Sequence, residues 1–116
     1  MHLPTTFEAL IEEAEKQSLY NKLIDQLNKD FLLANIDLDF NQNVLPTSLK
    51  LLLQETIYKL IQEKFVEYLN LLYIVDVSEN EIRALDGEDL FKLSEDVTFL
   101  ILKREWKKVW YRKNYS

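Results

Sequence analysis

The sequence TSLKLLLQETIYKLIQEKFVEYLNLLY, residues 47–73, carries apolar side chains three and four positions apart over its whole length. This spacing predicts a helix, because such positions share one face at 3.6 residues per turn. Thr47 or Ser48 is suited to cap its start. Further apolar residues fall outside the main face, namely Leu51, Tyr58, Val66 and Leu71. A helix that is apolar around most of its circumference is normally the most buried one, so we expect a long central helix over about 47–73.

Glycine and proline are scarce, with one glycine and two prolines in 116 residues. Tight hairpin turns require residues with positive φ, mostly glycine, so a β-sandwich of this length would lack residues for its turns. Leu, Glu, Lys and Gln, which favour helices, are abundant. A chain of this length fits one domain. The sequence predicts a single all-α domain over residues 1–116, a compact bundle of five or six helices around the central one.

The N-terminal half carries one helix-start signal and one predicted break. Thr5-Thr6-Phe7-Glu8 matches a capping box, in which a threonine and a glutamate satisfy the first N–H groups of a helix. The apolar stripes before and after residues 17–18 would lie on opposite sides of one continuous helix, so we expect two helices, with Ser18 capping the second. Helical periodicity stops over residues 35–46. This loop is expected to place three alternating apolar side chains on the core, those of Ile36, Leu38 and Phe40.

The C-terminal half carries further signals of the same kind. Ser78-Glu79-Asn80-Glu81 matches a second capping box and predicts a short helix. Gly87 is expected to end that helix in the left-handed conformation. A separate helical turn over residues 88–93 is expected next, and Ser94 is expected to start the final helix.

The residue types that most catalytic and metal sites require are missing. There is no cysteine, and His2 is the only histidine. The spacing Asp37-x-Asp39-x-Asn41-x-Asn43 matches the first four ligands of an EF-hand loop. However, Gln42 replaces the turn glycine and Ser48 replaces the bidentate glutamate. We therefore expect a non-catalytic protein with no cofactor and no metal, and interpret this segment as a loop whose side chains bind local backbone groups.

The last fourteen residues differ in charge from the rest of the chain. Residues 103–116 hold six basic residues and one acid (net +5), whereas residues 1–102 hold eight basic residues and nineteen acids (net −11). This basic aromatic segment also contains both tryptophans. Such a basic amphipathic segment is typical of a binding surface. The predicted partner-binding residues are Lys103, Arg104, Trp106, Lys107, Lys108, Trp110, Tyr111, Arg112 and Tyr115.

An alternative is that the apolar stripe of this helix packs inside its own domain. The stripe consists of Phe99, Leu102, Trp106, Val109 and Trp110. Tryptophan is highly buried on average. The basic residues would then complement the C-terminal end of the helix dipole and face the acidic body of the domain.

These features predict a cytoplasmic protein-interaction module that binds another protein or self-associates through its C-terminal helix. No membrane span is expected, since the longest apolar run is Leu71–Val75. One alternative is a nucleic-acid-associated accessory protein that uses the basic aromatic segment, although a net charge of −6 is unusual for that class. Another is an acidic decoy or immunity-type inhibitor. Its binding surface would consist of Glu12, Glu13, Glu15, Asp25 and Asp30.

Overall fold

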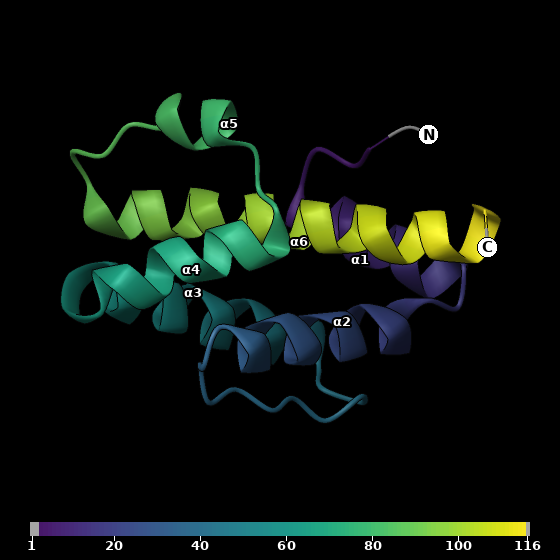
Figure 1. Cartoon of the computed structure of the whole chain (residues 1–116). Coiled ribbons are helices and arrows are strands. Elements are labelled where there is room, and N and C mark those ends of the chain that lie inside the picture. The colour runs from purple at the N-terminus through teal and green to yellow at the C-terminus, as the bar shows by residue number, and fades with distance from the viewer. Residues whose placement is uncertain (1–2, 116) are drawn as a thin grey trace.

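The computed structural model describes residues 3–115 of the chain. These residues fold into six helices and the segments that connect them (Figure 1). They are α1 (Phe7–Lys16), α2 (Tyr20–Leu33), α3 (Pro46–Glu63), α4 (Phe65–Val75), α5 (Glu79–Arg83) and α6 (Leu90–Tyr115). No strand occurs within this range. The prediction of an all-α bundle is therefore confirmed, while His2 lies outside the described residues.

The helix expected over 47–73 is broken, and this part of the prediction is wrong. Lys64 has φ −140° and ψ 62°, which separates α3 from α4. The break at Lys64 allows the inner faces of both helices to pack on one core.

The longest helix is instead α6, which has 26 residues and packs against α1, α2, α3 and α4. Figure 1 shows α6 crossing the bundle, with α1 near its C-terminal half and α5 near its N-terminal half. Residues 97–102 are almost entirely buried, as their apolar character predicted. The C-terminal helix is therefore part of the core over most of its length.

Three helices end in a left-handed residue that is not glycine. Ser18 (φ 58°), Asn35 (φ 63°) and Asp76 (φ 70°) adopt this conformation. The break at residues 17–18 is confirmed, but Ser18 does not cap α2. It ends α1 in a Schellman motif, in which the Leu19 N–H donates to the Ala14 carbonyl at 2.7 Å. The glycine prediction is wrong, because the φ angle of Gly87 is not positive.

The starts of α1 and α5 agree with the predicted signals to within one residue. The Ser78 hydroxyl accepts a hydrogen bond from the Glu81 N–H at 3.4 Å, which confirms this cap. The Thr6 hydroxyl accepts from the Ala9 N–H at 3.1 Å. Because Ala9 occupies the third helical position after Thr6, the reciprocal glutamate bond predicted for Glu8 is not part of this cap.

The start of α6 differs from the prediction. Asp89 Oδ1 accepts hydrogen bonds from the N–H groups of Phe91 (3.0 Å) and Lys92 (3.2 Å), so Asp89 caps the helix. Ser94 lies inside the helix, is fully buried, and donates its hydroxyl to the Phe91 carbonyl. The separate turn expected over residues 88–93 is therefore mostly the first turn of α6.

The loop between α2 and α3 packs as predicted. Ile36 and Phe40 are buried and Leu38 is half-buried against the core. The Asn28 side chain holds the loop, since it bonds both the N–H and the carbonyl of Phe40 at 2.8 Å. Asn41 Oδ1 accepts a hydrogen bond from the Asn43 N–H, a local backbone contact of the expected kind.

Candidate interaction site at the end of α6

The two tryptophans belong to the fold rather than to a free surface. Trp106 is only 1% exposed and lies among the buried side chains of the core. Trp110 is half-buried and packs against the same core. The apolar stripe of α6 thus packs inside its own domain, which is the alternative raised above. Trp106 is consequently removed from the contact surface predicted from the sequence.

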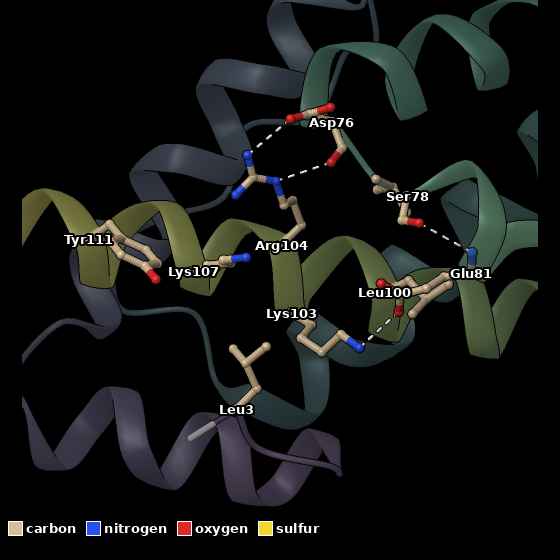
Figure 2. A pocket seen from close by; sticks show the side chains of 10 residues that line it. Leu3, Asp76, Ser78, Glu81, Leu100, Lys103, Arg104, Lys107 and Tyr111 are labelled. Carbon is tan, nitrogen blue, oxygen red and sulfur yellow. Dashed lines mark hydrogen bonds and ion pairs between the residues drawn. The ribbon is translucent and has the colours of Figure 1, made fainter. Parts of the chain in front are cut away.

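Two of the predicted basic residues pair with carboxylates of the same molecule. Lys103 Nζ lies 3.0 Å from Glu81 Oε2 at the start of α5. Arg104 binds Asp76 twice, from Nη2 to the carboxylate and from Nε to the backbone carbonyl, each at 3.1 Å (Figure 2). Both pairs fasten the turn between α4 and α5 to α6, so these cations are largely neutralised within the fold.

Lys108 is directed into the bundle. Its Nζ lies 2.8 Å from Asp30 Oδ2 and 3.2 Å from Glu105 Oε1, and it also approaches the Ile74 carbonyl at 3.4 Å. Both carboxylate side chains are almost completely buried. Lys108 therefore serves as an internal counter-ion between α2, α4 and α6 rather than as a partner contact.

The buried carboxyl groups share one proton-binding site. Burial raises the pKa of Glu105 to about 9, and the hydrogen bond and charge of Asp30 add to this effect against the opposing Lys108. Burial also acts to raise the pKa of Asp30, but hydrogen bonds from Glu105, Lys108 and Gln26 outweigh it and lower that pKa. With a pKa of about 9, Glu105 holds its proton at neutral pH.

This polar cluster was missed from the sequence, although a signal for it exists. Glu105 lies three residues after Leu102 and four before Val109, a core position on the helix. Asp30 lies three residues after Leu27 on α2. A charged residue at a core position indicates a buried pair. Because Asp30 is buried, it does not belong to the acidic surface proposed for a decoy. Glu12, Glu15 and Asp25 of that surface are exposed.

The exposed aromatic residues of the segment gather at the last turns of α6. The Tyr111 and Tyr115 rings stack with centroids 5.3 Å apart, and both rings meet Trp110 edge-on. Tyr111 is 42% exposed and Tyr115 is 73% exposed. Because Trp110 is anchored on the core, it fixes the position of the two tyrosines.

Three cations lie on the same turns of α6, and one of them, Lys107, lies against the aromatic group. Lys107, Arg112 and Lys113 form no ion pair with any carboxylate of residues 3–115. The Lys107 ammonium lies 5.9 Å from the centre of the Tyr111 ring. We call the six residues of this surface the terminal patch: Lys107, Trp110, Tyr111, Arg112, Lys113 and Tyr115.

A groove of about 600 Å³ borders the terminal patch. Its walls come from α6, from the turn after α4 and from the N-terminal segment at Leu3 (Figure 2). Within it, Lys107 lies between Tyr111 and Arg104. Lys107, with the Tyr111 hydroxyl beside it, provides donors for a carboxylate of a bound partner.

Residues 3–115 contain no group of three or more His, Cys, Asp or Glu side chains able to hold a metal ion. In the segment that resembles an EF-hand, the Gln42 amide donates to the Asp25 carboxylate of α2. None of the six helices described is long and apolar enough to cross a membrane.

Comparison of the chain with known protein families, with curated proteins and with solved structures finds no match. Function is therefore inferred from the geometry of the terminal patch and of the helices around it.

Proposed function

We propose that the protein is a non-catalytic interaction module that binds an acidic surface of a partner protein through the terminal patch. The observation that carries this proposal is the position of Lys107, Arg112 and Lys113. They adjoin two exposed, mutually stacked tyrosines and have no carboxylate partner among residues 3–115. A cytoplasmic location belongs to the same proposal and fits the absence of cysteine.

The composition of the terminal patch suits protein recognition. Tyrosine, tryptophan and arginine are the residues that most often dominate binding energy at interfaces. The preceding turns of α6 are buried, so the helix backbone that carries the patch is already formed before binding. Its positive charge would accelerate association with an acidic partner and orient it. That partner is another protein or the acidic body of a second copy.

A second candidate function is nucleic-acid binding by the same residues. The stacked Tyr111 and Tyr115 rings favour it, because exposed aromatic rings can stack on bases while nearby cations bind phosphates. The net charge of −6 opposes it. The two functions differ in salt dependence, since phosphate contacts weaken steeply between 50 and 200 mM salt.

The proposal is tested by affinity purification from extracts of cells that contain the protein. Wild type is compared with Tyr111→Ala/Tyr115→Ala, and with Tyr58→Ala/Phe91→Ala as a matched control. The control removes another aromatic pair, with centroids 6.4 Å apart, on α3 and α6. A partner protein retained by wild type and by the control, but not by the first variant, supports the proposal. Equal retention by all three contradicts it.

The nucleic-acid candidate has its own assay. Fluorescence anisotropy of a labelled twenty-nucleotide oligo(dT) is measured at 50 and 200 mM salt, with Lys107→Glu/Arg112→Glu/Lys113→Glu as the comparison. The proposal predicts no saturable binding by either protein. Binding by wild type that falls steeply with salt and is lost in the variant would assign the patch to nucleic acid instead.

A further inference from the structure

Helix α4 exposes an apolar face, although the sequence predicts a helix buried on most of its sides in this region. Four large side chains, between 49% and 86% exposed, form this face: Phe65, Val66, Leu69 and Tyr73. Each residue is rotated by 100° around the helix axis from the one before it, so these four side chains cover an arc of about 100° around α4. The opposite side of α4 carries the buried residues Tyr68, Leu71 and Val75. We call the four exposed residues the α4 stripe.

A groove extends the α4 stripe towards α5. It has a volume of about 520 Å³. Its apolar lining consists of Leu69, Leu72, Tyr73, Val77 and Ile82, and the charged residues Asp76, Glu79 and Arg83 also line it. Contiguous apolar patches of a few hundred Å² on a folded protein normally mark an interaction site. Among the described helices, α4 is also far too short to serve as a membrane span. The stripe is therefore best explained by a protein surface that covers it.

We propose that the α4 stripe is the contact face between two copies of this chain, related by a two-fold axis at Leu69. The stripe is symmetric about that residue, because Phe65 lies four positions before it and Tyr73 four positions after it. Antiparallel pairing of two α4 helices places Leu69 against Leu69 of the second copy. It also places Phe65 of each copy against Tyr73 of the other.

The area of the α4 stripe suits a modest dimer. Fully exposed aromatic side chains offer roughly 200 Å² each, so the four partly exposed residues present on the order of 500 Å² per copy. A standard stable interface buries about 800 Å² per partner. The groove wall at Leu72 and Ile82 supplies part of the difference. We therefore expect a weak, concentration-dependent dimer rather than a permanent one.

The two ends of α4 distinguish the possible orientations of the pair. Lys64, at the start of α4, pairs with no carboxylate within the described range. At the other end, Arg104 binds the carboxylate and the carbonyl of Asp76, and Lys108 Nζ approaches the Ile74 carbonyl at 3.4 Å, so cations of α6 already neutralise this end. A parallel pair would bring the two Lys64 side chains together, whereas the antiparallel pair keeps them apart.

Single cysteine variants test the register directly, because the chain has no cysteine of its own. Leu69→Cys is expected to form a disulfide-linked dimer under mild oxidation. Phe65→Cys alone is not, because the two copies of residue 65 are about 12 Å apart along the helices. A mixture of Phe65→Cys and Tyr73→Cys is expected to cross-link. Leu51→Cys, an exposed leucine position on α3, is the matched control.

Sedimentation equilibrium tests the non-covalent dimer. Leu69→Glu is expected to remain monomeric at concentrations where wild type and Leu51→Glu dimerise, and circular dichroism verifies that each variant is folded. The inference is wrong if Leu69→Glu dimerises like wild type, or if Leu69→Cys cross-links no faster than Leu51→Cys. It is also wrong if Tyr111→Ala/Tyr115→Ala, rather than Leu69→Glu, abolishes dimerisation. These outcomes separate dimerisation through the α4 stripe from self-association through the terminal patch.

Discussion

Lys108 Nζ lies 2.8 Å from Asp30 Oδ2, an ion pair that joins α6 to α2 across 78 positions of the chain. Asp30 is buried, and Lys108 also contacts the buried Glu105. This contact fixes the side of α6 that faces the bundle. The basic residues of the C-terminal segment thus have two roles. Lys108 binds carboxylates inside the bundle, whereas the cations of the terminal patch lie at its surface.

Replacing Lys108 by alanine is expected to lower the free energy of unfolding by about 3 kcal/mol. Its removal leaves the buried Asp30 carboxylate without a counter-ion, and breaking one side of a buried pair costs about that amount. Urea denaturation at pH 7 measures the change. Lys107→Ala, a lysine without an ion pair among residues 3–115, is the matched control and should change stability by at most about 0.5 kcal/mol. Equal effects of the two variants would contradict the internal role of Lys108.

Stability is expected to fall as pH rises from about 5 to 9. Burial, reinforced by Asp30, raises the pKa of Glu105 from 4.5 to about 9. Between these values the folded protein holds a proton that the unfolded chain has released. The free energy of unfolding therefore decreases with pH, by at most about 1.4 kcal/mol per unit.

Glu105→Gln provides the comparison for this pH dependence, because its amide stays neutral and resembles the protonated acid. We expect a flatter curve of urea midpoint against pH for this variant. Glu63→Gln, the same change at an exposed position, should follow wild type. The lowered pKa of Asp30 acts in the opposite direction, but only as pH falls below about 4, outside this window. Parallel curves for wild type and Glu105→Gln would disprove the raised pKa.

Trp106 and Tyr115 are expected to respond very differently to truncation. Trp106→Ala opens a cavity in the core and should cost about 3–5 kcal/mol. Tyr115→Ala removes a largely exposed ring, and its effect should stay within roughly 0.5 kcal/mol. Thermal and urea denaturation of the two variants measure the difference. A small effect of Trp106→Ala would place this side chain outside the core.

Ser18→Gly is expected to stabilise the fold by about 1 kcal/mol. Ser18 has φ 58°, a conformation that costs an L-residue roughly 1–2 kcal/mol and that glycine adopts without strain. Part of this gain is offset by the greater freedom of glycine in the unfolded chain. Ser48→Gly, within α3, should instead destabilise by about 0.5–1 kcal/mol. The urea midpoint is expected to rise above that of wild type for Ser18→Gly and to fall below it for Ser48→Gly. Destabilisation by Ser18→Gly would contradict the left-handed backbone conformation of residue 18.

Local chemistry made the helical class, the break at residues 17–18 and the Ser78 cap predictable. The break at Lys64 was not, because no glycine or proline marks it and the apolar spacing continues through it. The break turns the buried faces of α3 and α4 towards one core, and such packing is a tertiary property. Likewise, Ser94 is a good cap by residue type, but Asp89 caps α6 one turn earlier and leaves Ser94 in the core.

The candidate site could be predicted only in part. The charge asymmetry drew attention to residues 103–116, and helix periodicity placed Trp106 on the apolar face. Which cations are neutralised depends on pairs far apart in sequence, such as Arg104 with Asp76. The α4 stripe was hidden for a related reason, since an apolar face reads the same in a sequence whether a core or a second molecule covers it.

The central claim is that the terminal patch, and not the rest of α6 or the α4 stripe, binds the partner protein. It is tested most directly by the amount of partner retained by three proteins at equal concentration: wild type, Tyr111→Ala/Tyr115→Ala and Leu69→Glu. We predict that the double variant loses at least ninety per cent of the retained partner, whereas Leu69→Glu, which removes only self-association, keeps it. Full retention by the double variant would contradict the claim.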